Sequence, residues 1–319
     1  MKMSLDEFID GLVSKIEEKG LYVEQKTKQK KNNDHERVGL CILTKEQKDA
    51  IDSGNGAQML LPTVWVEQLY EDDVDIDDAA NIVLNQYKVA LKEDPMDFNI
   101  NDVYDYNLMK DRLFLVLVNK DNNQNVMEDC PYIEFNDLII CVKIACKKDF
   151  NPNEGISSVK ITNYLLDKWG KTKEEILLDA YNNTKAFNPY KIVNINEILK
   201  EIYPDELLDQ GHPMWVCSGK RRIFGAIYLI YKDVLNEVAE QLNTTCICIL
   251  PSSIHELIIL DGNIVDITDE EAMLKLVQEV NSEVVLEEEI LSDNVYFYDA
   301  DKEELTDSNN NVIEFPFNQ

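Results

Sequence analysis

Residues 245–260 read Thr-Cys-Ile-Cys-Ile-Leu-Pro-Ser-Ser-Ile-His-Glu-Leu-Ile-Ile-Leu. The apolar runs Thr245–Leu250 and Leu257–Leu260 flank a polar connection, a pattern that predicts two neighbouring buried strands. Before them, Met214–Cys217 predicts another strand, and Ile223–Leu242 predicts a helix of about five turns. We therefore expect Met214–Leu260 to form one strand–helix–hairpin unit. Apolar residues at three-to-four spacing would pack the helix on the sheet: Ile227, Ile230, Val234, Val238 and Leu242.

Elsewhere, strands and helices come in blocks rather than in strict alternation. Leu113–Asn119 and Tyr132–Cys146 predict two buried strands joined by a polar loop, Lys120–Asp129. Further elements are expected after them, namely helices at Val159–Trp169, Lys173–Tyr181 and Asn194–Tyr203 and closing strands at Tyr296–Tyr298 and Val312–Phe317. This order is typical of an α+β fold with mostly antiparallel sheet and packed helices.

The N-terminal region has a pattern of its own. Residues 4–19 place apolar side chains on one helix face, with Ser4 as N-cap and Glu7 three residues later. Further on we expect strands at Val38–Leu43 and Gln58–Glu67, a helix at Ile76–Leu91, and an edge strand or hairpin in the lysine-rich run 26–31. The polar stretch 92–105 is the best candidate for a boundary. We expect one or two domains, with α+β regions at 1–95 and 96–319 and an acidic tail from residue 261.

The chain is strongly acidic, with 61 Asp and Glu against 31 Lys and Arg and a formal net charge of −30. Asp261–Gln319 holds 17 acids and two bases, and Glu67–Asp78 holds seven acids in twelve residues. Such runs are most often solvated faces that keep a protein soluble. They also repel nucleic acid and acidic membranes and attract basic partners. The partner class that we expect is therefore a basic or nucleic-acid-binding protein, without direct binding of nucleic acid or membrane.

Composition also bears on the compartment and on cofactors. No apolar run approaches the length of a bilayer crossing, and the N-terminus has no apolar signal core, so we expect a cytoplasmic protein. Seven cysteines, an odd number, argue against a disulfide framework. There is no Cys-x-x-Cys pair, no cofactor-binding motif and only three histidines. We therefore expect no metal site and no cofactor.

A candidate catalytic stretch lies between the two apolar strands. Ser252, Ser253, His255 and Glu256 supply the residue types of a nucleophile, a base and an orienting acid. In an extended backbone, however, His255 and Glu256 point to opposite faces, so a triad would need a distant acid. The alternative is a Pro-Ser-Ser turn or bulge whose hydroxyls bind backbone groups, with a structural histidine in the following strand. We favour this alternative.

A candidate anion site immediately precedes the predicted long helix. Lys220, Arg221 and Arg222 would join their charge to the positive end of the helix dipole, an arrangement that suits a phosphate or carboxylate. The Gly-x-x-x-x-Gly-Lys spacing of a phosphate-binding loop is absent. Alternatively, these cations form a turn and pair with nearby acids, which is the interpretation that we favour.

Several stretches, taken in order, resemble an uncharacterised bacterial family. They are Asp102–Asn107 with Asp111–Asn119, Trp169-Gly170, Gly225-Ala226, Leu250–Glu256 and Glu289–Asp299. The Leu-Pro-Ser-Ser-Ile-His-Glu stretch is the most specific of them. The family is a domain of unknown function, DUF5688, common in gut anaerobes, and the chain is similar to it over roughly residues 1–300. The resemblance implies a bacterial cytosolic setting and brings no catalytic residues.

Two functional hypotheses from different classes follow. The first is a non-enzymatic binding or regulatory protein that acts through its acidic surface. Its sharpest form is a nucleic-acid-mimicking inhibitor of a defence or nucleic-acid-binding protein. The second is a hydrolase-type enzyme that uses His255 with Ser252 or Ser253 and captures an anion at residues 220–222. Rows of carboxylates would favour mimicry, whereas a pocket holding His255 beside a distant acid would favour an enzyme.

Overall fold

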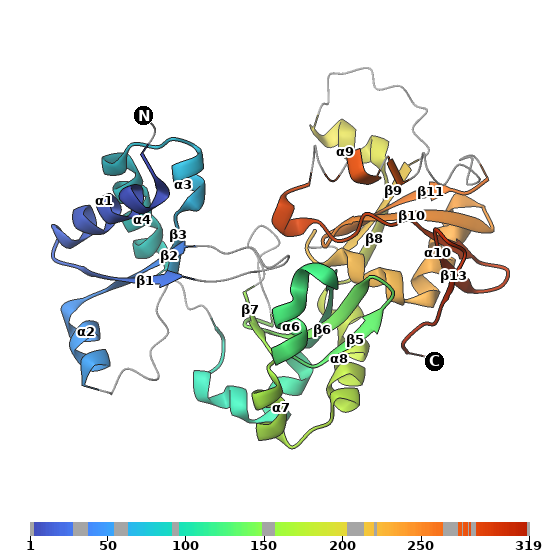
Figure 1. Ribbon diagram of the computed structural model, residues 1–319. Helices are drawn as coiled ribbons and strands as arrows, with labels where there is room; N and C mark the ends of the chain where they lie inside the picture. Colours follow the sequence, from blue (N-terminus) through green and yellow to red (C-terminus); the bar gives the residue numbers. More distant parts are fainter. Residues whose placement is uncertain are drawn as a thin grey trace. The chain divides into compact units, whose positions relative to one another are not determined.

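The computed structural model describes residues 3–27, 38–53, 63–90, 96–148, 157–202, 214–219, 222–263, 274–275, 277–279, 281 and 285–317 (Figure 1). The chain divides into two compact units, Met1–Asn101 and Asp102–Gln319. The described residues contain helices and three sheets, and the strand pairings within these sheets are all antiparallel. The predicted α+β class is confirmed.

The first unit packs helices on a small sheet. Its elements are α1 (Leu5–Glu17), β1 (Tyr22–Thr27), β2 (Val38–Leu43), α2 (Lys45–Asp52), β3 (Thr63–Trp65), α3 (Glu67–Glu71) and α4 (Ile76–Ala90). α1 begins at the predicted capping box, in which Ser4 and Glu7 each accept a hydrogen bond from the other's backbone N–H. The sheet order is β1–β2–β3, so β1 is an edge strand. The apolar face of α1 packs into the core of this unit with side chains of α4 and the sheet.

In the second unit, the smaller sheet has the order β4–β6–β5, and β7 also pairs with β6. Its strands are β4 (Leu113–Asn119), β5 (Tyr132–Phe135), β6 (Leu138–Ala145) and β7 (Ser158–Lys160). The prediction of one strand over Tyr132–Cys146 is wrong. Asn136 adopts a left-handed conformation (φ 56°), which turns the chain into the β5–β6 hairpin. The predicted loop 120–129 contains a 3₁₀ turn, η3 (Asp121–Asn123), and the helix α6 (Gln124–Asp129).

Two helices follow this sheet, α7 (Asn163–Trp169) and α8 (Lys173–Phe187). The helix predicted over Val159–Trp169 is wrong at its start, because residues 158–160 pair with β6 and the cap of α7 is Thr162. α7 ends, as predicted, at Gly170, whose φ of 60° is one that glycine adopts without strain. A capping box of Thr172 and Glu175 then starts α8.

The larger sheet has seven strands in the order β14–β13–β12–β10–β11–β9–β8. They are β8 (Tyr190–Asn194), β9 (Met214–Gly219), β10 (Cys246–Ser253), β11 (Glu256–Asp261), β12 (Tyr296–Asp299), β13 (Glu304–Asp307) and β14 (Val312–Ile313). Between them lie the helix α9 (Ile195–Ile202) after β8 and the 3₁₀ turn η5 (Glu287–Glu289) before β12. The predicted strands at 214–217, 245–250 and 257–260 thus pair in the centre of this sheet.

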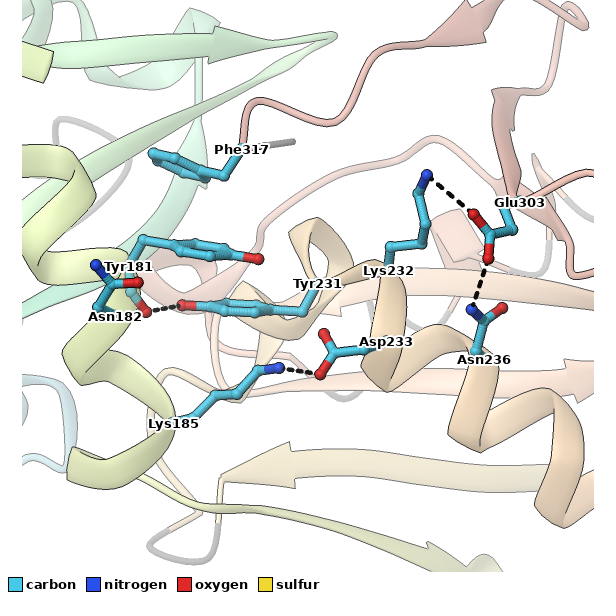
Figure 2. Close-up of a pocket in the computed structure, with 9 residues that line it drawn as sticks. All are labelled: Tyr181, Asn182, Lys185, Tyr231, Lys232, Asp233, Asn236, Glu303 and Phe317. Carbon is cyan, nitrogen blue, oxygen red and sulfur yellow. Dashed lines mark hydrogen bonds and ion pairs between the residues drawn. The ribbon is translucent and has the colours of Figure 1, made fainter. Parts of the chain in front are cut away.

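The single helix predicted over Ile223–Leu242 is wrong. The chain forms a buried 3₁₀ segment, η4 (Gly225–Ile230), passes through an extended residue, Tyr231 (φ −105°, ψ 99°), and then forms α10 (Lys232–Leu242). The break has a tertiary cause, since the Tyr231 hydroxyl donates to the carbonyl of Tyr181 in α8 at 2.9 Å and the two rings stack (Figure 2). Most of the residues expected to pack on the sheet are nevertheless buried: Ile227, Ile230, Val234 and Val238, with Leu242 partly exposed.

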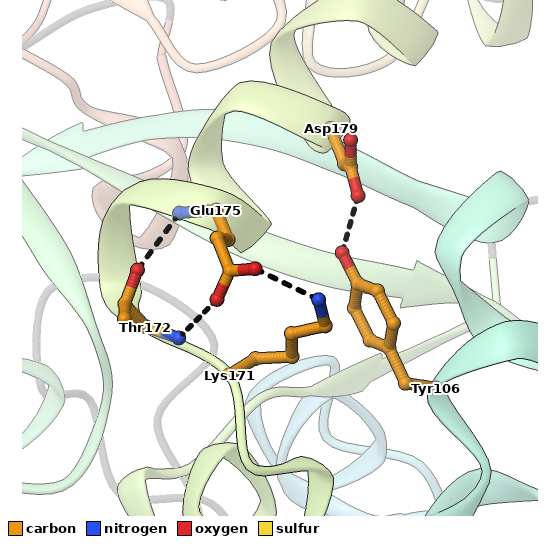
Figure 3. Close-up of polar contacts among 5 residues, drawn as sticks. All are labelled: Tyr106, Lys171, Thr172, Glu175 and Asp179. Carbon is orange, nitrogen blue, oxygen red and sulfur yellow. Dashed lines mark hydrogen bonds and ion pairs between the residues drawn. The ribbon is translucent and has the colours of Figure 1, made fainter.

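Further contacts hold α8 in place. α8 covers the outer edge of β4, where its Thr184 hydroxyl accepts the N–H of Leu115 at 2.9 Å. This contact satisfies a backbone donor that an open sheet edge would leave unpaired. Tyr106 donates its hydroxyl to Asp179 of α8 (Figure 3). Tyr106 belongs to the short elements that lead into β4, η1 (Ile100–Tyr104), α5 (Tyr106–Met109) and η2 (Lys110–Arg112).

The turn of the β5–β6 hairpin is bonded to the segment that leads into β12 and to the first residue of β12. Asp137 accepts hydrogen bonds from the hydroxyls of Ser292, at 2.6 Å, and Tyr296. Asn119 donates its side-chain amide to the carbonyl of Leu291 at 3.0 Å. These bonds connect the two sheets of the second unit and fix the chain that carries Glu289, which matters for the site described next.

Candidate functional site

The candidate catalytic stretch lies in the β10–β11 hairpin. A β-bulge falls between Leu250 and Ser253, and the hairpin turns at Ile254-His255. Of the two predicted alternatives, the stretch therefore forms a bulge within β10, whereas the turn lies one residue further on. His255 is accordingly in the turn and not in the following strand. β11 begins at Glu256, so His255 lies outside the strand. The alternation of side chains along β11 therefore does not determine which way the His255 side chain points.

The candidate anion loop lies against this turn. Gly225 donates its N–H to the carbonyl of His255 at 2.9 Å, which brings the end of the loop onto the hairpin. Arg222 lies in this loop and is exposed, whereas Lys220 and Arg221 lie outside the described residues. The described end of the basic stretch and the β10–β11 turn, about 30 residues apart in the sequence, therefore lie side by side.

Both ring nitrogens of His255 have a partner. The N–H of Phe224 donates to Nδ1 at 3.2 Å, and Nε2 lies 3.2 Å from Oε1 of Glu289. Because a backbone N–H can only donate, Nδ1 is the acceptor and Nε2 carries the proton that Glu289 accepts. The His255 side chain is 25% exposed and that of Glu289 is 32% exposed, so the pair is partly screened by water.

The two serines are buried and face other groups. Ser253 Oγ accepts the backbone N–H of His255 at 3.1 Å, and the carbonyl of Ser252 accepts the N–H of Leu291 at 2.9 Å. A serine nucleophile needs a base that accepts its proton. The distant acid that a triad required is present in Glu289, but the nitrogens of His255 bind Phe224 and Glu289 rather than a serine hydroxyl.

Glu256 is the second carboxyl of the cluster. Burial raises the pKa of Glu256 above its ordinary value, and electrostatic interactions with His255 and Arg222 offset part of this rise. Glu289 raises the pKa of Glu256 further, because two carboxylates disfavour each other's ionisation. Arg222 is thus close enough to Glu256 for its charge to act on that carboxyl, while the roles of the basic loop stay predictions.

The backbone of the loop is constrained. Arg222 and Phe224 both have φ of 54°, a left-handed conformation that costs about 1 kcal/mol or more for a residue with a side chain. At Gly225, a Cβ would lie 2.5 Å from the carbonyl oxygen of His255 and 2.3 Å from the nitrogen of Gly219, so no larger residue fits there. The His255 bonds therefore hold a loop that would otherwise relax.

Sequence reasoning missed Glu289, which lies 34 residues beyond His255. The stretch that begins at Glu289 contributed to the family resemblance, but no local spacing links it to the histidine. All seven cysteines are free thiols, and burial raises the pKa of Cys130 to about 11 and those of Cys141, Cys217 and Cys248 to about 12, which disfavours the nucleophilic thiolate form of these four. The described residues contain no group of three His, Cys, Asp or Glu side chains placed to hold a metal ion.

The chain matches a family of unknown function, DUF5688, over residues 5–300. It belongs to this family. The match confirms the resemblance inferred from the sequence and includes the whole His255 cluster of this DUF5688 chain. No curated protein and no solved structure matches the chain. In the described part of the chain, no helix combines the length and hydrophobicity that crossing a membrane requires.

Proposed function

We propose that this DUF5688 protein is a non-enzymatic binding or regulatory protein that recognises a basic partner through an acidic surface. The observation that carries the proposal is a group of exposed carboxylates between the end of α3 and the first turn of α4. The group, which we call the α3–α4 patch, consists of Glu71, Asp72, Asp73, Asp75, Asp77 and Asp78. A concentration of one sign of charge attracts a partner of the opposite sign and accelerates its association.

Acids of the C-terminal tail are engaged within the chain. Asp299 pairs with Lys302, Glu303 with Lys232, and Glu289 with His255, while Asp307 accepts hydrogen bonds from the chain that follows it. In the α3–α4 patch, Asp77 pairs with Lys15 at 2.7 Å, Asp72 accepts a hydrogen bond from the Gln68 side chain and Asp75 accepts one from the N–H of Asp77. We favour the α3–α4 patch over the tail as the partner-binding surface because its six acids lie within residues 71–78 and are all exposed.

The more specific form of the proposal is that the patch imitates the phosphates of a nucleic acid, so that the partner is a nucleic-acid-binding or defence protein of the bacterial cytoplasm. Duplex DNA binds such partners largely through its phosphate charge, and this binding weakens steeply as salt rises. A mimic would therefore compete with duplex DNA for its partner. A partner that binds the patch in the presence of excess DNA would support the general proposal without mimicry.

The hydrolase alternative receives no support from the geometry of His255, because its ring nitrogens are bonded to Phe224 and Glu289. The binding proposal is tested by capturing proteins from a bacterial lysate at two salt concentrations with three forms of the full chain. They are the natural chain, a patch variant (Asp72→Asn, Asp73→Asn and Asp75→Asn) and a control variant with the same loss of charge in the second unit (Asp121→Asn, Glu128→Gln and Asp129→Asn).

Asparagine suits the left-handed conformation of Asp73 and the turn at Asp75, so the patch variant should fold. We expect basic proteins to be retained at low salt by the natural chain and by the control variant, and to be lost from the patch variant. Equal retention by all three forms would contradict the proposal. Release of the captured proteins by duplex DNA would separate mimicry from simple charge attraction.

A further inference from the structure

A cavity of about 530 Å³ lies between α8, the start of α10 and the C-terminal segment, and no residue of the His255 cluster lines it (Figure 2). Its size falls within the range of small-molecule sites, about 300–1,000 Å³. The three segments that line it come from distant parts of the sequence, so no local sequence pattern predicts it. Its walls have two distinct parts, one aromatic and one charged.

The aromatic wall is a stack of three rings. The ring of Tyr181 lies between those of Tyr231 and Phe317, with a centroid distance of 4.4 Å to each. Lys185 lies on the other side of Tyr231, 4.7 Å from its ring centroid (Figure 2). Both faces of each tyrosine ring are therefore covered, and a ligand meets ring edges. Ring edges carry partial positive charge and accept apolar or anionic groups.

The Tyr181 hydroxyl is directed away from the stack toward the charged wall (Figure 2). Among the described residues it has no hydrogen-bond partner, in contrast to the hydroxyl of Tyr231, which donates to the Tyr181 carbonyl. Burial and the charge of Asp233 raise the pKa of Tyr181, so this hydroxyl keeps its proton at neutral pH. It is therefore available as a donor to a bound carboxylate.

The charged wall consists of two ion pairs, each formed by one lysine and one acidic residue. Lys185 pairs with Asp233, and Lys232 lies 3.3 Å from Glu303, whose other oxygen accepts from Asn236 at 3.4 Å. All four charged side chains are one-third to two-thirds exposed. Exposed pairs of this kind contribute little net stability, so a ligand can insert its own charges between them at small cost. The four formal charges of this wall sum to zero.

We propose that this cavity binds a free α-amino acid with an apolar side chain. Such a ligand carries an ammonium and a carboxylate on one carbon, which complements a wall that presents both lysines and acids. The carboxylate would contact Lys232 and the Tyr181 hydroxyl, and the ammonium would contact Asp233. The side chain would pack against the edges of the ring stack.

Other small ligands fit these walls less well. A ligand with one sign of charge would bring it close to a side chain of the same sign, either the two lysines or the two acids. A sugar binds by stacking on an open aromatic face, and both tyrosine faces are covered. The zwitterion is the ligand class that uses both halves of the charged wall.

The test is isothermal titration calorimetry of the full chain with four probes. L-phenylalanine carries both charges, 3-phenylpropanoate lacks the ammonium, 2-phenylethylamine lacks the carboxylate, and glucose is an uncharged control. We expect L-phenylalanine to bind at least tenfold more tightly than either analogue. The proposal is overturned if L-phenylalanine does not bind at millimolar concentration, if the two analogues bind as tightly as it does, or if glucose binds in its place.

Variants locate the binding. Lys232→Gln and Asp233→Asn should each weaken binding of L-phenylalanine about tenfold or more, and Tyr181→Phe should weaken it severalfold. The matched controls are Lys48→Gln, which removes an exposed lysine paired with Asp52 in the first unit, and Tyr104→Phe at an exposed tyrosine. Unchanged affinity in all three cavity variants, each with an unchanged melting temperature, would place the amino acid elsewhere and refute this site.

Discussion

Replacing His255 with alanine removes two side-chain hydrogen bonds at once. The bond from the Phe224 N–H is between neutral groups and is worth about 1 kcal/mol, and the bond to the Glu289 carboxylate is worth about 1.5 kcal/mol after allowance for its partial exposure. We therefore expect His255→Ala to lower the free energy of unfolding by about 2–3 kcal/mol. The left-handed residues Arg222 and Phe224 would then be free to relax.

The measurement is urea unfolding followed by tryptophan fluorescence, since Trp169 and Trp215 report on the second unit. His255→Phe is the matched control, because it keeps a ring and removes both hydrogen bonds. It should lose nearly as much stability as His255→Ala. Hydrogen exchange gives a residue-level check, since the Phe224 amide should lose protection in both variants.

A double-mutant cycle with Glu289→Ala isolates the histidine–carboxylate bond, for which we expect a coupling energy of about 1–1.5 kcal/mol. A change below about 0.5 kcal/mol in His255→Ala would refute the structural role. If that unchanged stability came with the loss of a hydrolase activity by orders of magnitude, His255 with Ser252 or Ser253 would be an active site after all.

Four further outcomes are expected. Burial raises the pKa of Glu256 in the folded state, so ionisation of Glu256 destabilises the fold at a pH above this pKa and has no effect at a pH below the unfolded value near 4.5. Glu256→Gln should therefore raise the melting temperature at pH 7, and the gain should vanish by about pH 4. Gly225→Ala forces a Cβ to within 2.6 Å of backbone atoms and should lower the free energy of unfolding in urea by about 3 kcal/mol or more. In the control Gly20→Ala, the added Cβ has no atom within 4 Å but the backbone has φ of 79°, so the loss should be about 1 kcal/mol. Asp137→Ala leaves the hydroxyls of Ser292 and Tyr296 without their acceptor and should cost about 2–4 kcal/mol, against less than about 0.5 kcal/mol for Asp121→Ala at an exposed position. Because the excess of acids repels itself, added salt should raise the melting temperature; a temperature that does not move between low and high salt would mean that the charges are already compensated.

Sequence patterns located the elements whose burial is decided locally. The apolar runs at 245–250 and 257–260 are strands paired along both edges, and a continuous apolar run of this length is typical of a buried strand. α1 begins at Ser4 for an equally local reason, because its capping box involves residues three positions apart. In these cases, the spacing of apolar residues and the chemistry of the helix cap were sufficient to predict the element.

The failures arose where tertiary contacts override a local pattern. Ile223–Leu242 has helical spacing throughout, but Tyr231 bonds a carbonyl 50 residues away and adopts an extended conformation to reach it. The β5–β6 hairpin was missed for a different reason. Its signal, Asn136-Asp137 between two apolar runs, was present in the sequence, and asparagine readily adopts the left-handed conformation that it has there.

Part of the candidate site could be predicted from the sequence. His255 was singled out for its serine and glutamate neighbours, and Arg222 as part of the basic run before the predicted helix. That the two lie close together depends on β9 and β11 being neighbours in the sheet. Glu289 could not be found in this way, since the bond from the Ile254 N–H to the Glu289 carbonyl, at 2.9 Å, is what brings the tail beside the hairpin. Backbone pairing of this kind leaves no trace in side-chain spacing.

The broken helix connects the two sites of the second unit. η4 is anchored at its start by Gly225 on the His255 carbonyl and, just past its end, by Tyr231 on the Tyr181 carbonyl, and every residue of η4 is buried. A continuous helix would carry Tyr231 and its neighbours onward along one axis. The extended Tyr231 instead redirects the chain, so that Lys232 and Asp233 line the cavity while Tyr231 completes the ring stack. The buried η4 segment therefore positions the cavity wall at one end and contacts the His255 cluster at the other. The break at Tyr231, which made the prediction of a continuous helix wrong, is also what forms the proposed amino-acid site.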